Sequence, residues 1–247
     1  FTESGNNPAG GYQVNTTAGF SIVDYVGTGS AGTVAHGLGV TPAVIIVKNR
    51  DIGTDGEWNV FHHKNTAAPE TDFLIFNSTA TTTDAANRWN DTAPTSSVFT
   101  VGTTLRVNDD VAYVCYCFAP IQGYSKFGSY LGNGNADGTF IYLGFKPAFV
   151  IIKSSTKASQ GWHMLTGKIA RVNNGSFFGT NSNPVSDALD ADDAVAERGD
   201  FTTDFLSNGF KIRHVSGGTG TSGETYTYMA FAEQPFVTST GIPATAR

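Results

Sequence analysis

Short runs of apolar residues, separated by glycine-rich turns, recur along the whole chain. Residues 44–47 and 149–152 are continuous apolar runs that follow a proline, and residues 111–118 and 225–231 have a similar character. These runs are too short for helices and rich in β-branched and aromatic residues, so we expect them to form strands. Because a sheet must bury its apolar face against a second layer, short strands joined by turns predict a sandwich or a barrel.

The pattern of apolar and turn residues occurs twice in the sequence. Tyr25 aligns with Tyr130 and Lys48 with Lys153, and the offset of 105 positions holds without a gap between these pairs. Aromatic residues continue the match at slightly different offsets, pairing Trp58 with Trp162, Phe99 with Phe210, and Tyr113 with Tyr226. Self-similarity of this length is typical of tandem repeats. We therefore predict an all-β chain of two tandem, internally duplicated, jelly-roll-like β-sandwich units.

The repeat also sets the expected domain boundaries. Polar residues punctuated by Gly and Pro flank the two copies, as is usual for the ends of a domain. The expected order is a linker at residues 1–18, one sandwich at 19–122, a second sandwich at 123–236 and a C-terminal tail at 237–247.

One stretch of the second copy is a candidate helix. Residues 186–198 begin with Ser186 as the candidate N-cap, carry acids in the first turn and are followed by Gly199. These are helix start and stop signals. The apolar residues within the stretch are mostly Ala, so a loop fits as well as a short helix. The aligned residues 81–97 of the first copy are expected to form a plain polar loop.

Composition and charge narrow the classes of function. Charged residues make up 15% of the chain, against about 25% in typical domains. The net charge is -6 and the 15 basic side chains are thinly scattered. No electropositive stripe is therefore available to neutralise a phosphate backbone, and we expect no nucleic-acid partner. No apolar run approaches the roughly 20 residues of a membrane-spanning helix, so we expect a soluble chain without membrane association.

Motifs for cofactors and catalysis lack the context that their chemistry needs. Residues 27–32 match G-x-G-x-x-G, but further turn residues follow them, so we expect a strand-joining turn rather than a dinucleotide site. His62 and His63 have no acid or thiol at metal-ligand spacing. Cys115 and Cys117 point to one face of an expected strand, which disfavours a disulfide between them. We predict no catalytic residue, no resident metal and no enzymatic activity.

An acid-rich stretch in the second copy could hold a cation. Its carboxylates could bind Ca²⁺ or supply a catalytic pair for glycoside hydrolysis. The spacing fits no calcium-loop pattern, so a solvated acidic loop is the main interpretation and a Ca²⁺ site within residues 187–200 is the alternative. The acids are Asp187, Asp190, Asp192, Asp193, Glu197, Asp200 and, slightly further on, Asp204.

A polar loop holds the candidate ligand contact of the first copy. Trp89 lies among Asn87, Arg88, Asn90 and Asp91, where a core position is less natural than for the other tryptophans. An aromatic ring among amide and acid side chains is typical of carbohydrate sites, where the ring stacks on the apolar face of a sugar. The alternative is a tryptophan that packs beneath its own loop.

The two copies differ most between their aligned tryptophan and phenylalanine residues, where identities are lost and the lengths diverge. Loops held on a rigid scaffold often carry binding groups, so we predict that residues 77–97 and 179–204 are the recognition surfaces. The predicted ligand contacts within them are Asn87, Arg88, Trp89 and Asn90 in the first copy, and Asp190, Asp192 and Asp193 in the second.

Several short sequences point to a known family. They are residues 123–130 (GYSKFGSY), 134–138 (GNADG) and 145–150 (FKPAFV), together with residues 33–39 and 228–233. These sequences resemble a repeated domain of uncharacterised function in tail-fibre and other virion proteins of aquatic bacteriophages. The resemblance covers roughly residues 19–236 and carries no catalytic residue. It implies a β-structured, oligomeric component exposed on the virion surface.

Three functions compete on this basis. The leading expectation is a non-enzymatic tail-fibre or receptor-binding module that presents loops to a host-surface carbohydrate. The second is a capsid decoration or other structural virion protein that binds only other virion proteins. A polysaccharide depolymerase is the third. The expected partners are other virion proteins and further copies of the chain itself, with a trimer favoured.

Overall fold

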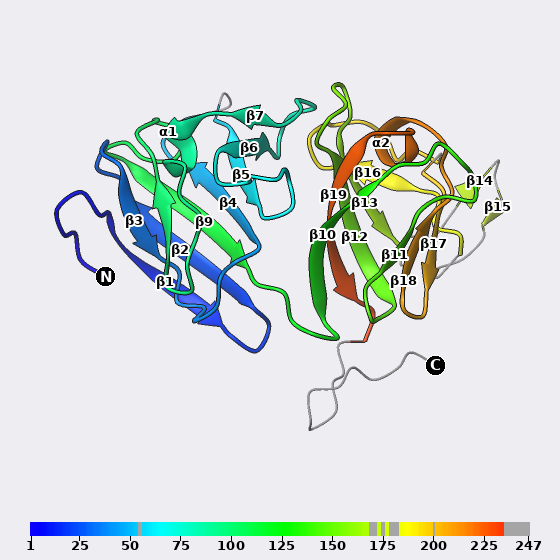
Figure 1. Ribbon diagram of the computed structural model, residues 1–247, viewed down its shortest axis with the longest axis horizontal. Helices are drawn as coiled ribbons and strands as arrows, with labels where there is room; N and C mark the ends of the chain where they lie inside the picture. The colour runs from blue at the N-terminus through cyan, green and yellow to red at the C-terminus, as the bar shows by residue number, and fades with distance from the viewer. Residues whose placement is uncertain (54–55, 168–171, 174–175, 178–182, 200, 235–247) are drawn as a thin grey trace. The chain divides into compact units, whose positions relative to one another are not determined.

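The computed structural model describes residues 1–53, 56–167, 172–173, 176–177, 183–199 and 201–234. Within these residues the chain consists of antiparallel sheets with two one-turn helices (Figure 1). The all-β prediction is confirmed. The chain divides into two compact units, residues 1–77 with 82–121 and residues 122–247 with 78–81.

The first unit contains a larger and a smaller sheet. The larger sheet has seven strands in the order β1-β2-β9-β4-β5-β6-β7, and β3 pairs with β8 in the smaller one. A one-turn helix, α1 (Ala86–Trp89), lies between β7 and β8 in the sequence. The strands are β1 (Ala9–Asn15), β2 (Phe20–Val26), β3 (Gly32–Ala35), β4 (Val44–Asn49), β5 (Trp58–His62), β6 (Asp72–Ile75), β7 (Thr83–Asp84), β8 (Val98–Val101) and β9 (Ala112–Phe118).

The second unit has a five-stranded sheet in the order β10-β19-β12-β13-β16 and a three-stranded sheet in the order β11-β18-β17. A short hairpin of β14 and β15 and the one-turn helix α2 (Gly217–Gly220) complete it. The strands are β10 (Ser125–Leu131), β11 (Phe140–Tyr142), β12 (Pro147–Ser154), β13 (Trp162–Thr166), β14 (Val172–Asn173), β15 (Ser176–Phe177), β16 (Ala188–Asp190), β17 (Thr203–Leu206), β18 (Gly209–Ile212) and β19 (Thr225–Ala232).

The larger sheets of the two units share an order of pairing. In the first, β2, β9, β4, β5 and β6 are successive neighbours, and in the second β10, β19, β12, β13 and β16 take the same places. The registers also agree, because Lys48 faces Trp58 in one sheet and Lys153 faces Trp162 in the other. A tandem duplication would explain both this order and the sequence repeat, and it stays a prediction.

An aromatic trio organises the core of the first unit. The ring of Tyr25 stacks on Tyr113 at a centroid distance of 5.0 Å and meets the edge of Phe99 at 6.3 Å. The buried Tyr25 hydroxyl donates to the carbonyl of Val107 at 2.6 Å, so its polar end is satisfied. Aromatic pairs of this geometry contribute about 0.5–1.5 kcal/mol each beyond the burial of their area.

A matching trio organises the core of the second unit. Tyr130 stacks on Tyr226 at 5.1 Å and meets the edge of Phe210 at 6.3 Å. Its hydroxyl donates to the carbonyl of Thr219 at 2.8 Å. The sequence repeat aligns these three residues with the first trio. The aligned aromatic residues therefore pack in the same way in both units.

Both cysteines are core residues of the first unit. Cys115 and Cys117 are fully buried on β9, and their sulfurs lie 3.5 Å apart without a bond. Burial, followed by the interaction with Cys117, raises the pKa of the Cys115 thiol well above its usual value. A neutral, buried thiol is a poor nucleophile, so these side chains act here as small core residues.

Two expected loops and one candidate helix have different structures. Residues 9–15, expected within a linker, form β1, which pairs with β2 along its whole length. The candidate helix at residues 186–198 is wrong, because Ala188 is buried in the core and exchanges two backbone hydrogen bonds with Arg198. Residues 81–97, expected as a plain loop, include β7 and α1. The predicted tail at residues 237–247 lies outside the described residues.

The glycine-rich stretch after β2 is a turn that leads into β3, as predicted. Gly29 adopts a φ of +69°, and its aligned residue Gly134 adopts +65°. Side chains with a Cβ rarely adopt this conformation, so both turns require glycine. A strand rather than a helix follows the turn in each unit, which removes the helix N-terminus on which a dinucleotide site depends.

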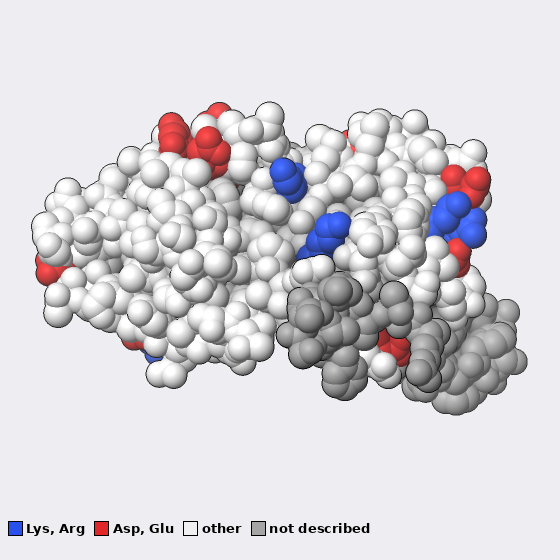
Figure 2. All heavy atoms as spheres, turned by 60° about the horizontal axis from the view of Figure 1, so that its bottom comes forward, with Lys and Arg blue, Asp and Glu red and all other residues white. Residues whose placement is uncertain are grey.

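Charged residues are sparse on the surface. On the face drawn in Figure 2, the Lys and Arg side chains form small separate groups, and neutral residues cover most of the described surface. No helix in the part of the chain that the structure describes has the length and apolar character needed to cross a membrane.

Candidate functional site

Trp89 is a core residue. It is 2% exposed at the end of α1, its ring meets the edge of Phe61 at 6.1 Å, and its Nε1 donates to the carbonyl of Asp72 at 3.1 Å. The predicted ligand contact has no support in this structure, because the ring has no exposed face to offer. A turn of helix beside polar neighbours directs this side chain inward, beneath its own loop.

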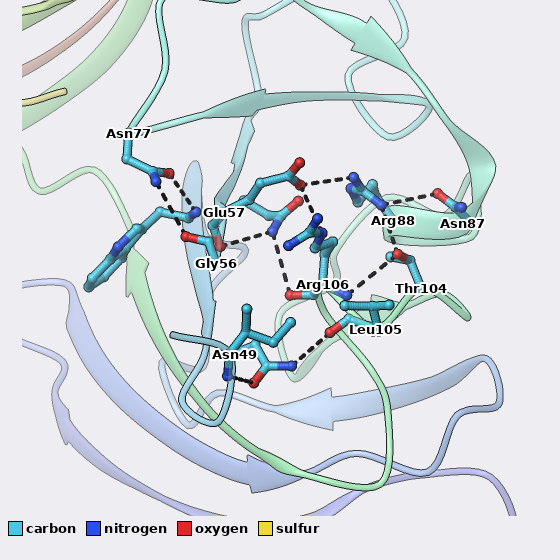
Figure 3. A network of polar contacts seen from close by, with 12 residues as sticks. Asn49, Gly56, Glu57, Asn77, Asn87, Arg88, Thr104, Leu105 and Arg106 are labelled. Atoms are coloured by element: carbon cyan, nitrogen blue, oxygen red, sulfur yellow. Dashed lines mark hydrogen bonds and ion pairs between the residues drawn. The ribbon is translucent and has the colours of Figure 1, made fainter. Parts of the chain in front are cut away.

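Arg88 joins a network of polar contacts with Glu57 and Thr104 (Figure 3). Its Nη2 lies 3.1 Å from Oε2 of Glu57, its Nη1 donates to Oγ1 of Thr104 at 3.0 Å, and its guanidinium lies 4.3 Å from the ring centre of Phe73. Arg106 contacts the same Glu57 oxygen at 3.7 Å. The side chain of Arg88 is only 11% exposed, so it fastens α1 to the neighbouring segments.

Asn87 and Asn90 are the predicted contacts of the first unit that remain on the surface. The Oδ1 of Asn87 accepts from Arg88 Nη1 at 3.4 Å, and Asn90 ends α1 in a left-handed conformation with φ 52°. Asn tolerates this conformation better than most residues. Both have a local structural role, and neither faces an exposed aromatic ring of the predicted loop, because Trp89 is buried.

Asp192 secures the start of β13. Its Oδ1 accepts the backbone N–H of Trp162 at 2.5 Å, while the N–H of Ala191 donates to the carbonyl of Trp162. In the first unit, Asn77 accepts the backbone N–H of Trp58 at 2.9 Å in the same way (Figure 3). An amide oxygen in one unit and a carboxylate oxygen in the other therefore accept a hydrogen bond from the aligned tryptophan backbone. This hydrogen bond gives Asp192 a structural role.

Asp190 is buried between His163 and Arg198. Its Oδ1 lies 2.6 Å from Nδ1 of His163, and its Oδ2 lies 2.9 Å from Nη1 of Arg198. The side chain of Asp190 is 3% exposed and that of His163 is 1% exposed. The predicted ligand contact of Asp190 has no support in this structure, because β16 places this side chain opposite His163 of β13, where it is buried. The register places Asn59 of the first unit at the position that His163 takes in the second.

His163 is packed on all the sides that the structure describes. Its ring centre lies 4.1 Å from that of Phe201, and a Cβ on Gly218 would lie 1.8 Å from Nε2. Nε2 is buried without a hydrogen-bond partner. Burial lowers the pKa of His163, and the hydrogen bond to Asp190 opposes that shift. A neutral ring with its proton on Nδ1 fits these contacts, and among the described residues Gly218 closes the space beside Nε2.

The acid-rich stretch does not assemble a cation site within the described residues. Asp193 is exposed beyond β16, whereas Asp190 and Asp192 are held by the contacts above. No group of three His, Cys, Asp or Glu side chains suited to a metal occurs in the described part of the chain. Asp200 and residues 179–182 of the predicted surface lie outside it.

A small cleft opens in the first unit. It has a volume of about 240 Å³, and its walls are mostly apolar because four prolines and Phe61 contribute to them. Ala93 and Pro94, from the predicted surface at residues 77–97, form part of the rim, and His63 and Thr41 add polar groups. The prolines are Pro42, Pro69, Pro94 and Pro120.

Two exposed aromatic residues lie side by side on the second unit. Phe140 is 44% exposed and Tyr142 is 59% exposed, on the outer face of the edge strand β11. Ile141, between them, points into the core. We refer to Phe140 and Tyr142 as the aromatic surface. Its signal in the sequence is the alternation Phe-Ile-Tyr, which is too short to distinguish an exposed pair from a buried one.

Polar groups lie beside Phe140, whereas Tyr142 faces Gly209. Lys211 faces Phe140 across the sheet, and Asp204 faces Lys211 on the next strand. Lys211 pairs with Asp137 at 2.5 Å and Arg213 with Asp204 at 2.6 Å. The Phe140 side of the aromatic surface is thus bordered by hydrogen-bond donors and acceptors that pair with one another.

Comparison with known families identifies the family of the chain. The sequence model of a family described as a domain of unknown function (DUF7483) matches residues 8–235. The chain belongs to this family. One match to the DUF7483 model spans both units, so the family domain comprises the pair. No curated protein and no solved structure matches the chain.

Proposed function

We propose that this DUF7483 chain is a non-enzymatic adhesion module of a virion, in a tail fibre or another receptor-binding part, and that it binds a host-surface carbohydrate. The observation that carries the proposal is the aromatic surface, Phe140 and Tyr142, exposed on the outer face of β11. The virion setting rests on the sequence resemblance to phage tail-fibre domains.

The chemistry of the aromatic surface suits a sugar. The apolar face of a sugar ring stacks on an aromatic side chain, while its hydroxyl groups need both donors and acceptors. Lys211 supplies donors and Asp137 and Asp204 supply acceptors beside the rings. Because Ile141 anchors β11 in the apolar core, the strand backbone that carries the rings is fixed before a ligand arrives, which lowers the entropic cost of binding.

The proposed binding surface lies on a sheet rather than in the loops predicted from the sequence. Trp89 and Asp190, which headed the sequence-based candidates, are buried at 2% and 9% exposure. Phe140 and Tyr142 are far more exposed than either, although each belongs to a regular strand. Asn87, Asn90 and Asp193 stay on the surface as secondary candidates.

The test is glycan binding by the whole chain and by variants of the aromatic surface. We expect Tyr142→Ala and Phe140→Ala each to weaken binding by about 1–3 kcal/mol, with little change in thermal stability. Leu105→Ala removes an equally exposed apolar side chain, 47% exposed, from the first unit and serves as the control. A glycan array followed by calorimetry on a hit would measure this, and wild-type binding by both variants would exclude this surface.

Enzymatic activity would separate this proposal from a depolymerase. Incubation of a bound polysaccharide with the chain should leave its length unchanged, as followed by the appearance of new reducing ends. Release of oligosaccharides that Tyr142→Ala also abolishes would contradict the non-enzymatic part of the proposal while keeping the binding site.

A second candidate function is favoured by the cleft of the first unit. Its proline and phenylalanine walls offer few polar groups to a sugar, and apolar concavities of this kind suit a protruding side chain of another protein. Other virion proteins would then be the partners. Ala93→Arg would fill the rim, so it should reduce incorporation of the chain into particles while leaving carbohydrate binding intact.

A further inference from the structure

Lys126 distinguishes the aromatic surface from an ordinary exposed aromatic pair. Its Nζ lies 5.3 Å from the ring centre of Tyr142 and donates to the backbone carbonyl of the same residue at 2.7 Å. The amine is therefore held beside the ring face by a backbone contact. An ammonium group has three donors, and this contact uses one of them.

The charge of Lys126 is not balanced locally. Within the described residues, no carboxylate lies within 4.0 Å of its Nζ. The other two cations of the region are paired, Lys211 with Asp137 and Arg213 with Asp204. Three positive and two negative charges leave a local excess of one positive charge, on a chain whose net charge is -6.

We propose that the ligand of the aromatic surface is an acidic sugar, whose carboxylate binds the Lys126 ammonium while its ring stacks on Tyr142 and Phe140. This inference rests on the proposed carbohydrate binding at the same surface. A carboxylate accepts from the free donors of Lys126 in a charge-assisted hydrogen bond. A neutral sugar makes the same stacking contact and lacks that bond.

The first unit lacks every part of this arrangement. The residues aligned with Lys126, Phe140 and Tyr142 at the offset of 105 are Ser21, Ala35 and Gly37. In the first unit, moreover, the chain itself covers this place. A Cβ on Gly37 would lie 2.3 Å from the ring of Tyr12, which belongs to β1. The second unit has no described strand on the outer edge of β10, so its aromatic rings stay open to a ligand.

The experiment compares one oligosaccharide in two forms. A hexuronic-acid tetrasaccharide and its carboxyl-reduced, neutral counterpart are titrated by calorimetry into the whole chain at low and at physiological salt. We expect the acidic form to bind about fivefold more tightly, as for an exposed ion pair, and the preference to shrink as salt screens the charges.

Three variants make the result specific to Lys126. Lys126→Gln should bind the acidic and the neutral oligosaccharide about equally, whereas Lys126→Arg should keep most of the preference for the acidic form. Lys64→Gln removes one exposed positive charge from the first unit and should leave the preference unchanged. Circular dichroism and thermal melts of each variant report whether the fold is retained.

The possible outcomes test the acidic ligand separately from carbohydrate binding in general. Equal binding of both forms by a chain that Tyr142→Ala inactivates would overturn the acidic ligand and keep carbohydrate binding. Failure to bind either form, or any glycan on an array, would overturn both. Acidic binding that Lys126→Gln abolishes and Tyr142→Ala leaves intact would show simple ion exchange and overturn the stacked geometry.

Discussion

Trp89 is one of the largest fully buried side chains of the first unit. Its ring is 2% exposed among the residues of the main apolar cluster, and its one polar atom is bonded to a backbone carbonyl. Asn87 and Asn90, on either side of it in the sequence, are exposed. A tryptophan in a polar stretch can therefore be a core residue when a single helical turn directs it inward.

Replacing Trp89 should consequently affect stability rather than ligand binding. Trp89→Ala leaves a large cavity, and we expect it to lower the free energy of unfolding by about 3–5 kcal/mol. Asn87→Ala, two positions away and exposed, should change it by less than about 0.5 kcal/mol. Denaturant unfolding measures both, and a stable Trp89→Ala variant with impaired glycan binding would restore the tryptophan as a ligand contact.

At the scale of elements, the pairing of β13 with β16 buries a titratable group. The two strands place His163 opposite Asp190, and burial lowers the pKa of the imidazole despite that partner. The folded state therefore favours the neutral ring, whereas the unfolded chain takes up a proton near the ordinary pKa of 6.5. The unfolded state binds more protons in this window, so stability falls as the pH drops below about 6.5 and is unaffected above it.

The expected result is a free energy of unfolding that decreases between about pH 7 and pH 5. His163→Asn, which introduces the residue found at the equivalent position of β5, should flatten this dependence. Some slope should remain, because burial also lowers the pKa of His36. Urea unfolding at a series of pH values measures it, and an unchanged slope in the variant would show that His163 titrates alike in both states.

The elements also show how far the sequence could predict the fold. Apolar runs gave β4 and β12 because buried strands need continuous apolar residues. β1 and β16 were missed, since Gly10 and Gly11 in the one and Asp190 in the other do not form such a pattern. Pairing partners, rather than side-chain character, make these segments strands.

The candidate site was harder to predict for a related reason. Exposure of Phe140 and Tyr142 depends on which face of β11 meets the core, and a three-residue strand carries too little alternation to decide that. The contact between His163 and Asp190 joins residues 27 positions apart. Such a contact follows from strand register alone, which the sequence around either residue does not specify.

At the scale of the whole molecule, an unpaired strand edge bears on self-association. β10 lies at the end of its sheet, and no described strand pairs with its outer edge. Such edges are templates for pairing with another chain. Together with the resemblance to oligomeric virion domains, this edge supports the expectation that the chain self-associates, with a trimer favoured.

Light scattering over a range of dilutions tests this expectation. We expect the mass to approach that of a trimer as concentration rises, and Ser129→Lys on β10 to weaken association, because lysine protects strand edges. Ser97→Lys, at an exposed position of the first unit, is the matched control. A monomer at every dilution would exclude self-association of the chain by itself.

The placement of Phe140 and Tyr142 has a consequence for how such a module evolves. Neither residue belongs to the apolar cluster that holds the second unit together, while Ile141 between them does. Mutations at positions 140 and 142 are therefore nearly free of folding constraints, whereas those at 141 are not. If the chain binds sugars as proposed, its binding preference can change through two positions of one short strand while the rest of the protein stays the same.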